Sequence, residues 1–97
     1  PTAIFAGSDL QAMGVYEAAR QLGLRIPEDL SVVGFDDVQT AAFLGPALTT
    51  VRQPLQDMAR AAVRMLIEAL STDDVIQPHI IMPTSLVVRN STQQLEG

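Results

Sequence analysis

Hydrophobic residues recur every three to four positions over residues 54–70 and predict the most regular helix of the chain. They fall at i, i+3, i+4, i+7, i+8, i+11, i+12 and i+15, the spacing of one helix face: Leu55, Met58, Ala59, Ala62, Val63, Leu66, Ile67 and Leu70. Pro54 suits the first turn of this helix because its fixed φ is helical and the N–H it lacks has no partner there. Residues 71–77 are polar and predict a loop.

A strand, a helix and a second strand are predicted before residue 36. Residues 2–6 form a short apolar run of strand type. Ser8 and Gln11 then have the spacing of a capping box, and apolar positions follow a helical period until Gly23 supplies a left-handed stop. Residues 30–35 are a near-continuous, valine-rich run that predicts a buried strand. Two strands joined by such a crossover are expected to be parallel, with a right-handed connection.

The rest of the chain predicts shorter elements. A helical turn is expected around residues 41–44, and strands are expected at residues 48–51, 80–82 and 85–89, the second of them ended by Pro83. The fold class indicated by the whole pattern is α/β, with a doubly wound, mostly parallel sheet. With 97 residues, the chain is one compact unit or a piece of a larger one.

Charge and composition exclude several classes of protein. The formal net charge is −5, opposite to the basic surface that DNA phosphates require, so we expect this segment not to bind nucleic acid directly. The chain has no cysteine, which excludes disulfides and thiolate metal sites. It has no secretion signal and no apolar run of membrane-spanning length, so we expect a cytoplasmic protein without membrane contact.

Two adjacent carboxylates, Asp36 and Asp37, follow the valine-rich strand at the edge where open parallel sheets bind ligands. Paired acid–base chemistry or a metal site is one interpretation, but neighbouring strand residues point to opposite faces and a third carboxylate at suitable spacing is missing. The alternative is that one aspartate organises the turn while the other accepts hydrogen bonds from the hydroxyls of a sugar or nucleoside. Ser8 follows the neighbouring strand and either caps the helix or contacts such a ligand.

An esterase-like triad is a further alternative, because Ser8, one of the two aspartates and His79 occur in the chain order of α/β hydrolases. Leu10 stands where a nucleophile elbow requires a small residue, which argues against this alternative. The arginines are scattered along the sequence, so solvated faces and separate ion pairs are expected for them.

Four stretches together resemble the LacI/GalR family of transcriptional repressors. They are PTAIFAGSDLQAMG (1–14), IPEDLSVVGFDD (26–37), PALTTVRQP (46–54) and PTSLVVRNST (83–92). The resemblance implies a fragment of the type I periplasmic-binding-protein-like fold, in which a small effector bound between two lobes allosterically controls DNA binding. It implies neither an enzyme nor a cofactor nor a metal.

The resemblance also implies an organisation for this chain. Residues 1–52 and about 83–97 would belong to the C-terminal lobe, and residues of about 53–82 would belong to the N-terminal lobe. The DNA-binding helix-turn-helix would lie outside this chain, so operator DNA would be bound by another part of a homodimeric protein. A sugar-binding protein of a transport system shares the fold and is the main rival.

Particular residues follow from the same resemblance. Asp36 matches the carboxylate that hydrogen-bonds the effector, and Ser8 stands where the family more often has asparagine. Residues matching the opposite wall of the effector cleft are Gln53, Leu55 and Met58. Residues matching the dimer contact are Met13, Glu17, Arg20, Phe43 and Leu44. For the last two, a role in the core is an equally good interpretation.

Overall fold

The computed structural model describes residues 1–71 and 80–95 and consists of two units. Unit 1 comprises Pro1–Arg52 and Ser85–Gly97, and unit 2 comprises Gln53–Thr84. The chain therefore leaves unit 1 after Arg52 and re-enters it at Ser85. The assignment of the units to the lobes of a larger protein stays a prediction.

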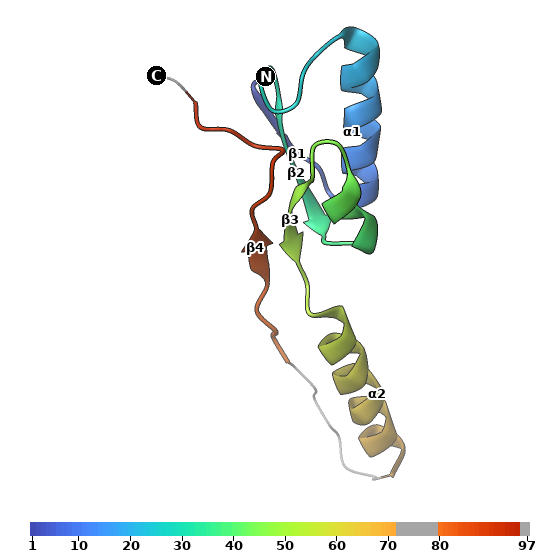
Figure 1. Ribbon diagram of the computed structural model, residues 1–97. Helices are drawn as coiled ribbons and strands as arrows, with labels where there is room; N and C mark the ends of the chain where they lie inside the picture. The colour runs from blue at the N-terminus through green and yellow to red at the C-terminus, as the bar shows by residue number, and fades with distance from the viewer. Residues whose placement is uncertain (72–79, 96–97) are drawn as a thin grey trace. The chain divides into compact units, whose positions relative to one another are not determined.

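Unit 1 is built on a four-stranded sheet whose spatial order follows the sequence (Figure 1). Its strands are β1 (Ala3–Phe5), β2 (Ser31–Asp36), β3 (Thr49–Arg52) and β4 (Ser85–Val87). The first three are parallel, which confirms the predicted pairing of the first two, and β4 is antiparallel to β3 at the edge. Ile4 lies opposite Val32 in the register of β1 and β2.

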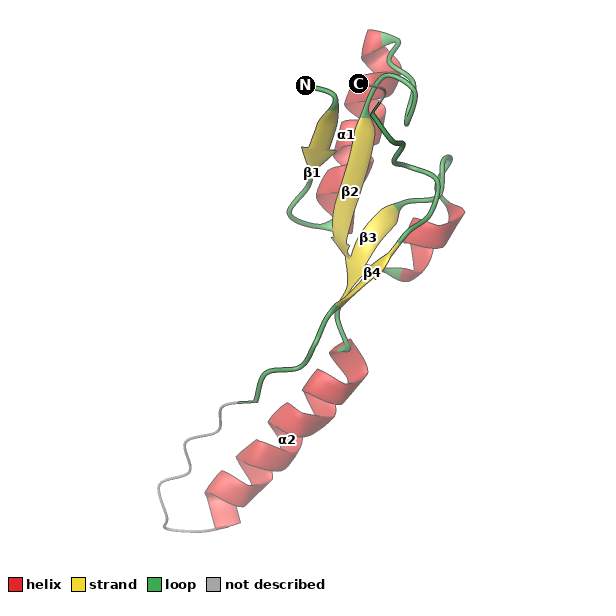
Figure 2. Cartoon of the chain, turned by 90° about the vertical axis from the view of Figure 1, so that its left-hand side faces the viewer, coloured by secondary structure: helices red, strands yellow, loops and turns green. Residues whose placement is uncertain are grey.

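Helix α1 (Asp9–Leu22) connects β1 to β2 and lies against one face of the sheet (Figure 2). Its predicted cap at Ser8 is confirmed, because the Ser8 hydroxyl oxygen accepts the Gln11 N–H at 3.1 Å. The return bond of a capping box differs, since the Gln11 side chain accepts the Gly7 N–H at 2.9 Å instead of that of Ser8. Gly23 ends the helix with φ 71°, a conformation that glycine adopts without steric cost.

The core of unit 1 is small and lies on the α1 side of the sheet. Its buried hydrophobic residues are Ala6, Ala12, Leu30, Val32, Ala41 and Leu48. Ala41 belongs to a short 3-10 helix, η1 (Gln39–Phe43), close to the predicted turn. Phe5, Leu86 and Val88, on β1 and in the β4 segment, are exposed.

The segment after β4 connects β2 and β3 through hydrogen bonds. Ser91 is fully buried, and its hydroxyl accepts the Thr49 N–H at 2.8 Å and donates to the Val32 carbonyl oxygen at 2.6 Å. The Val32 N–H in turn donates to the Ser91 carbonyl oxygen at 2.9 Å. The end of the chain is therefore part of the unit 1 framework.

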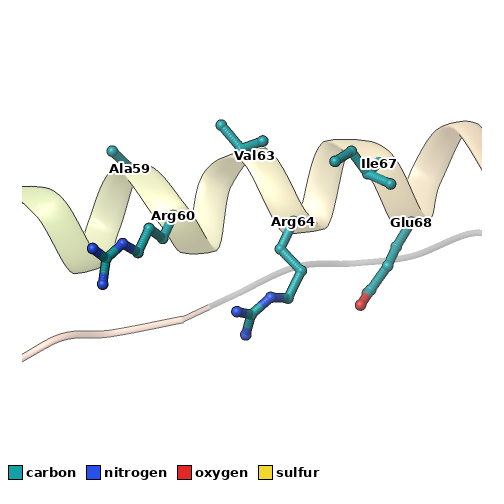
Figure 3. Close-up of a pocket in the computed structure, with 6 residues that line it drawn as sticks. All are labelled: Ala59, Arg60, Val63, Arg64, Ile67 and Glu68. Atoms are coloured by element: carbon teal, nitrogen blue, oxygen red, sulfur yellow. The ribbon is translucent and has the colours of Figure 1, made fainter.

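Unit 2 contains α2 (Leu55–Ser71), which confirms the strongest predicted helix. None of its residues is buried within this chain. Figure 3 shows Ala59, Val63 and Ile67 along one side of the helix and Arg60, Arg64 and Glu68 along the other. These six residues line an open hollow of about 650 Å³. No helix in the described part of the chain is both long and apolar enough to cross a bilayer.

The prediction of a strand at residues 80–82 is wrong, because these residues have no regular secondary structure. A strand needs a hydrogen-bonded neighbour, and the described part of unit 2 contains none. Pro83 also removes a donor from this segment.

Candidate functional site

The polar site predicted at the end of β2 is a turn with an unusual backbone. Asp36 has a φ of 122° and Asp37 a φ of 59°. Residues other than glycine rarely adopt a positive φ. The backbone here therefore departs from the regular strand geometry on which the predicted divergence of the two carboxylates was based. Such a conformation persists only where the surroundings fix it.

Asp37 is fixed by two arginines. Arg52 Nε lies 2.7 Å from Asp37 Oδ2, and an Arg89 guanidinium nitrogen lies 2.8 Å from Asp37 Oδ1. The Asp37 side chain is only 9% exposed. Burial raises the pKa of Asp37, but the hydrogen bonds and charges of Arg52 and Arg89 outweigh this effect and hold the pKa below its ordinary value. Asp37 therefore carries a negative charge at neutral pH, and it is the aspartate that organises the turn.

Arg89 is itself held in place and is not a solvated surface residue as the sequence had suggested. Its side chain is 17% exposed, and its guanidinium also donates to the Leu48 carbonyl oxygen at 2.8 Å. Its backbone N–H donates to the Thr49 hydroxyl oxygen at 2.9 Å. Arg89 thus reaches Asp37 from a position defined by β3.

Asp9 fixes the other side of the turn and was missed by the sequence analysis. This fully buried carboxylate accepts the Val38 N–H at 2.8 Å and the Thr50 hydroxyl at 2.6 Å. It therefore ties the start of α1 to β3 and to the residue after Asp37. The signal that could have found it is Gly34, because a glycine in a valine-rich strand indicates a close approach by another group. A Cβ at Gly34 would collide with Asp9 Oδ1 and lie 2.9 Å from Leu48 Cδ2.

Ser8 caps α1, as one of the two interpretations predicted. Its oxygen accepts the Gln11 N–H, so towards a ligand its hydroxyl hydrogen remains available as a donor. The capping bond does not activate Ser8 as a nucleophile, and the other triad candidate, His79, lies outside the described residues. Nothing in the described geometry supports the hydrolase alternative.

The other predicted effector residues belong to unit 2. Gln53 is half-buried, while Leu55 and Met58 are exposed by 53% and 40%. A site that these residues share with Asp36 of unit 1 stays a prediction.

The residues predicted for the dimer contact form two sets. Glu17 and Arg20 are an exposed ion pair with a 2.6 Å separation on α1, near half-buried Met13. In η1, Phe43 is 83% exposed, and the adjacent Leu44 packs against the core cluster. Phe43 therefore fits a contact surface better than Leu44 does, and the homodimer itself stays a prediction.

Among residues 1–71 and 80–95, no three histidine, cysteine or acidic side chains lie close enough to hold a metal ion. Each Asp37 oxygen already accepts a hydrogen bond from an arginine, so that carboxylate serves the framework. Asp36 is the carboxylate placed at the strand end, and carboxylate oxygens accept hydrogen bonds from hydroxyl groups.

Comparisons with known proteins extend this picture. Residues 1–92 match the model of the periplasmic binding protein-like domain. The chain is 52% identical over 93 residues to an HTH-type transcriptional regulator in the aml 5′ region of Streptomyces limosus, covering 96% of this chain and 26% of that protein. The chain thus spans about a quarter of the length of this curated relative.

Solved structures agree in fold. The transcriptional regulator CelR in complex with cellobiose is 36% identical with a TM-score of 0.88, covering 93% of this chain and 28% of CelR. A LacI family regulator from Enterococcus faecalis with bound ribose is 32% identical with a TM-score of 0.92, covering 97% of this chain and 35% of that one. These matches confirm the predicted class, a fragment of a doubly wound α/β fold of the periplasmic-binding-protein type.

Proposed function

The chain belongs to the periplasmic-binding-protein-like domain family of LacI-type transcriptional regulators, and from this premise we propose that it is part of a sugar-sensing domain of such a regulator. In this proposal the effector is an uncharged sugar, and a nucleoside is the alternative. Its binding would allosterically control a DNA-binding part outside these 97 residues.

The observation that carries the proposal is the position of Asp36 at the carboxyl end of β2, on an edge formed by three parallel strands. Ser8 follows the carboxyl end of β1, so two polar side chains follow neighbouring strands. The solved relatives with cellobiose and ribose support a sugar over other uncharged ligands. Regulators among the relatives favour this function over a transport protein.

In this proposal Gln53, Leu55 and Met58, which belong to unit 2, also contact the effector. The proposed homodimer uses Met13, Glu17, Arg20 and Phe43, with Leu44 supporting Phe43 from the core. We assign none of these residues a catalytic role.

A thermal-shift screen of the full-length protein tests the function. We expect a sugar such as cellobiose or ribose, at about a hundredfold excess over its Kd, to raise Tm by about 5 °C, since ligand binding at that excess adds about 2.7 kcal/mol to the free energy of unfolding. Mannitol, an open-chain polyol, is the control and is expected to leave Tm unchanged. Stabilisation by amino acids or anions, with no response to any sugar or nucleoside, would contradict the proposal.

The 97-residue chain alone is expected not to retard operator DNA at physiological salt, because its net charge of −5 opposes phosphate binding. A gel-shift titration measures this, with the full-length protein as the positive control on the same DNA. Retardation by the isolated chain at micromolar concentration would show that the DNA-binding surface is within this segment.

A further inference from the structure

Asp37 forms two ion pairs that differ in their exposure to solvent. Arg52 is 56% exposed, whereas Arg89 is 17% exposed and is also anchored to the Leu48 carbonyl oxygen. An exposed ion pair restrains its two side chains weakly, because water competes for the charges. An ion pair with little solvent contact and additional hydrogen bonds fixes the positions of both side chains more strongly. Arg89 is therefore the stronger of the two restraints on Asp37.

The Asp37 carboxylate is attached to a backbone that needs such a restraint. Asp36 and Asp37 both have a positive φ, a costly conformation for residues with a side chain. Three contacts oppose a return to ordinary strand geometry: Arg89 and Arg52 hold the Asp37 side chain, and Asp9 holds the next amide, that of Val38. Loss of the stronger side-chain contact would let the turn relax, and Asp36 would move with it.

We infer that Arg89 is a positioning residue for the effector site: by holding Asp37, it fixes the backbone at Asp36 and so aims the carboxylate that binds the sugar. This inference rests on the proposed function for the identity of the ligand. The restraint on the turn can be measured without any ligand. Arg89 does not touch the effector in this scheme, and it acts through Asp37.

Sugar affinity of the full-length protein is the first measurement. We expect Arg89→Gln to raise the Kd for the sugar, cellobiose or ribose, about tenfold at a temperature well below Tm. Arg52→Gln, which removes the exposed partner, is expected to raise it less than threefold. Arg25→Gln is the control, because Arg25 forms an exposed ion pair with Asp29 in the same unit and this substitution is expected to leave the Kd unchanged. Arg89→Lys keeps the charge but cannot reach both Leu48 and Asp37 with one planar group, so partial recovery is expected.

A double-mutant cycle separates positioning from general damage to the fold. If Arg89 acts through Asp37, then Arg89→Gln changes the sugar Kd less than twofold in a protein that already carries Asp37→Asn. A full tenfold further loss in that background would overturn the inference, because Arg89 would then act by another route.

Hydrogen exchange in the sugar-free protein tests the turn itself. The Val38 N–H, bonded to Asp9, reports on its geometry, so we expect exchange in peptides covering residues 35–38 to be at least tenfold faster in Arg89→Gln than in wild type or Arg25→Gln. Unchanged exchange overturns the inference even if no sugar binds, whereas absence of sugar binding by wild type counts against the proposed function alone. Faster exchange with an unchanged sugar Kd also overturns it, because the turn would then not control the effector site.

Discussion

Removing the Asp36 carboxylate from the full-length protein is expected to weaken sugar binding about a hundredfold and to abolish the effector response. A carboxylate that accepts hydrogen bonds from two sugar hydroxyls loses both, and each hydrogen bond to a charged group contributes about 1.5 to 3 kcal/mol. A loss of about 3 kcal/mol corresponds to roughly a hundredfold in Kd. Calorimetric titration of the sugar measures it.

The choice of substitution matters because of the backbone at this position. Alanine at Asp36 would remove the carboxylate but keep the Cβ that strains a residue with a φ of 122°, whereas glycine adopts a positive φ readily. Asp36→Gly and Asp36→Ala should therefore lose sugar affinity alike, with Asp36→Gly the more stable of the two. Operator binding in the absence of sugar should be retained in both. Wild-type sugar affinity in either variant would remove Asp36 from the site.

Gly34→Ala is expected to destabilise the protein by about 3 kcal/mol or more. The added methyl group would collide with Asp9 Oδ1 and lie 2.9 Å from Leu48 Cδ2, and both neighbours are fully buried. Overpacking of a core costs about 1 to 3 kcal/mol, and a displaced Asp9 would also give up buried hydrogen bonds from Val38 and Thr50. Urea unfolding monitored by circular dichroism measures the change.

Gly14→Ala is the matched control for this substitution. Gly14 lies in α1 with open space where its Cβ would be, so alanine there should stabilise the helix by about 0.5 to 1 kcal/mol. Equal stability of the Gly34→Ala variant and wild type would show that Asp9 can move away from β2 at no cost.

The helices and strands that the sequence predicted correctly are specified by residues close to one another in the chain. The period of apolar residues in α2 and the cap at Ser8 both lie within a few positions of the structure they specify. The parallel pairing of β1 with β2 follows from the helix between them, because short crossovers have one handedness. The position of Asp36 at a strand end could be predicted for the same reason.

The contacts that fix the site connect residues far apart in the sequence. Asp9 reaches Val38 and Thr50 across 29 and 41 positions, and Arg89 reaches Asp37 across 52. No periodicity carries such information, so the arginines looked scattered although two of them meet on one carboxylate. The strand predicted at residues 80–82 failed for a related reason, because an apolar run becomes a strand only beside a partner.

Arg52 and Ser85 face each other across β3 and β4, at the two points where the chain leaves and re-enters unit 1. Opposite residues in antiparallel strands lie about 5 Å apart, a distance that a two-residue Asn-Gly turn closes as a β-hairpin. All of residues 53–84 is thus an insertion in what would otherwise be a tight hairpin. Insertions at such a site can be exchanged or resized without shifting the register of the sheet that hosts them, so residues 53–84 can vary while β2, which ends at Asp36, and the segment bearing Arg89 stay in place.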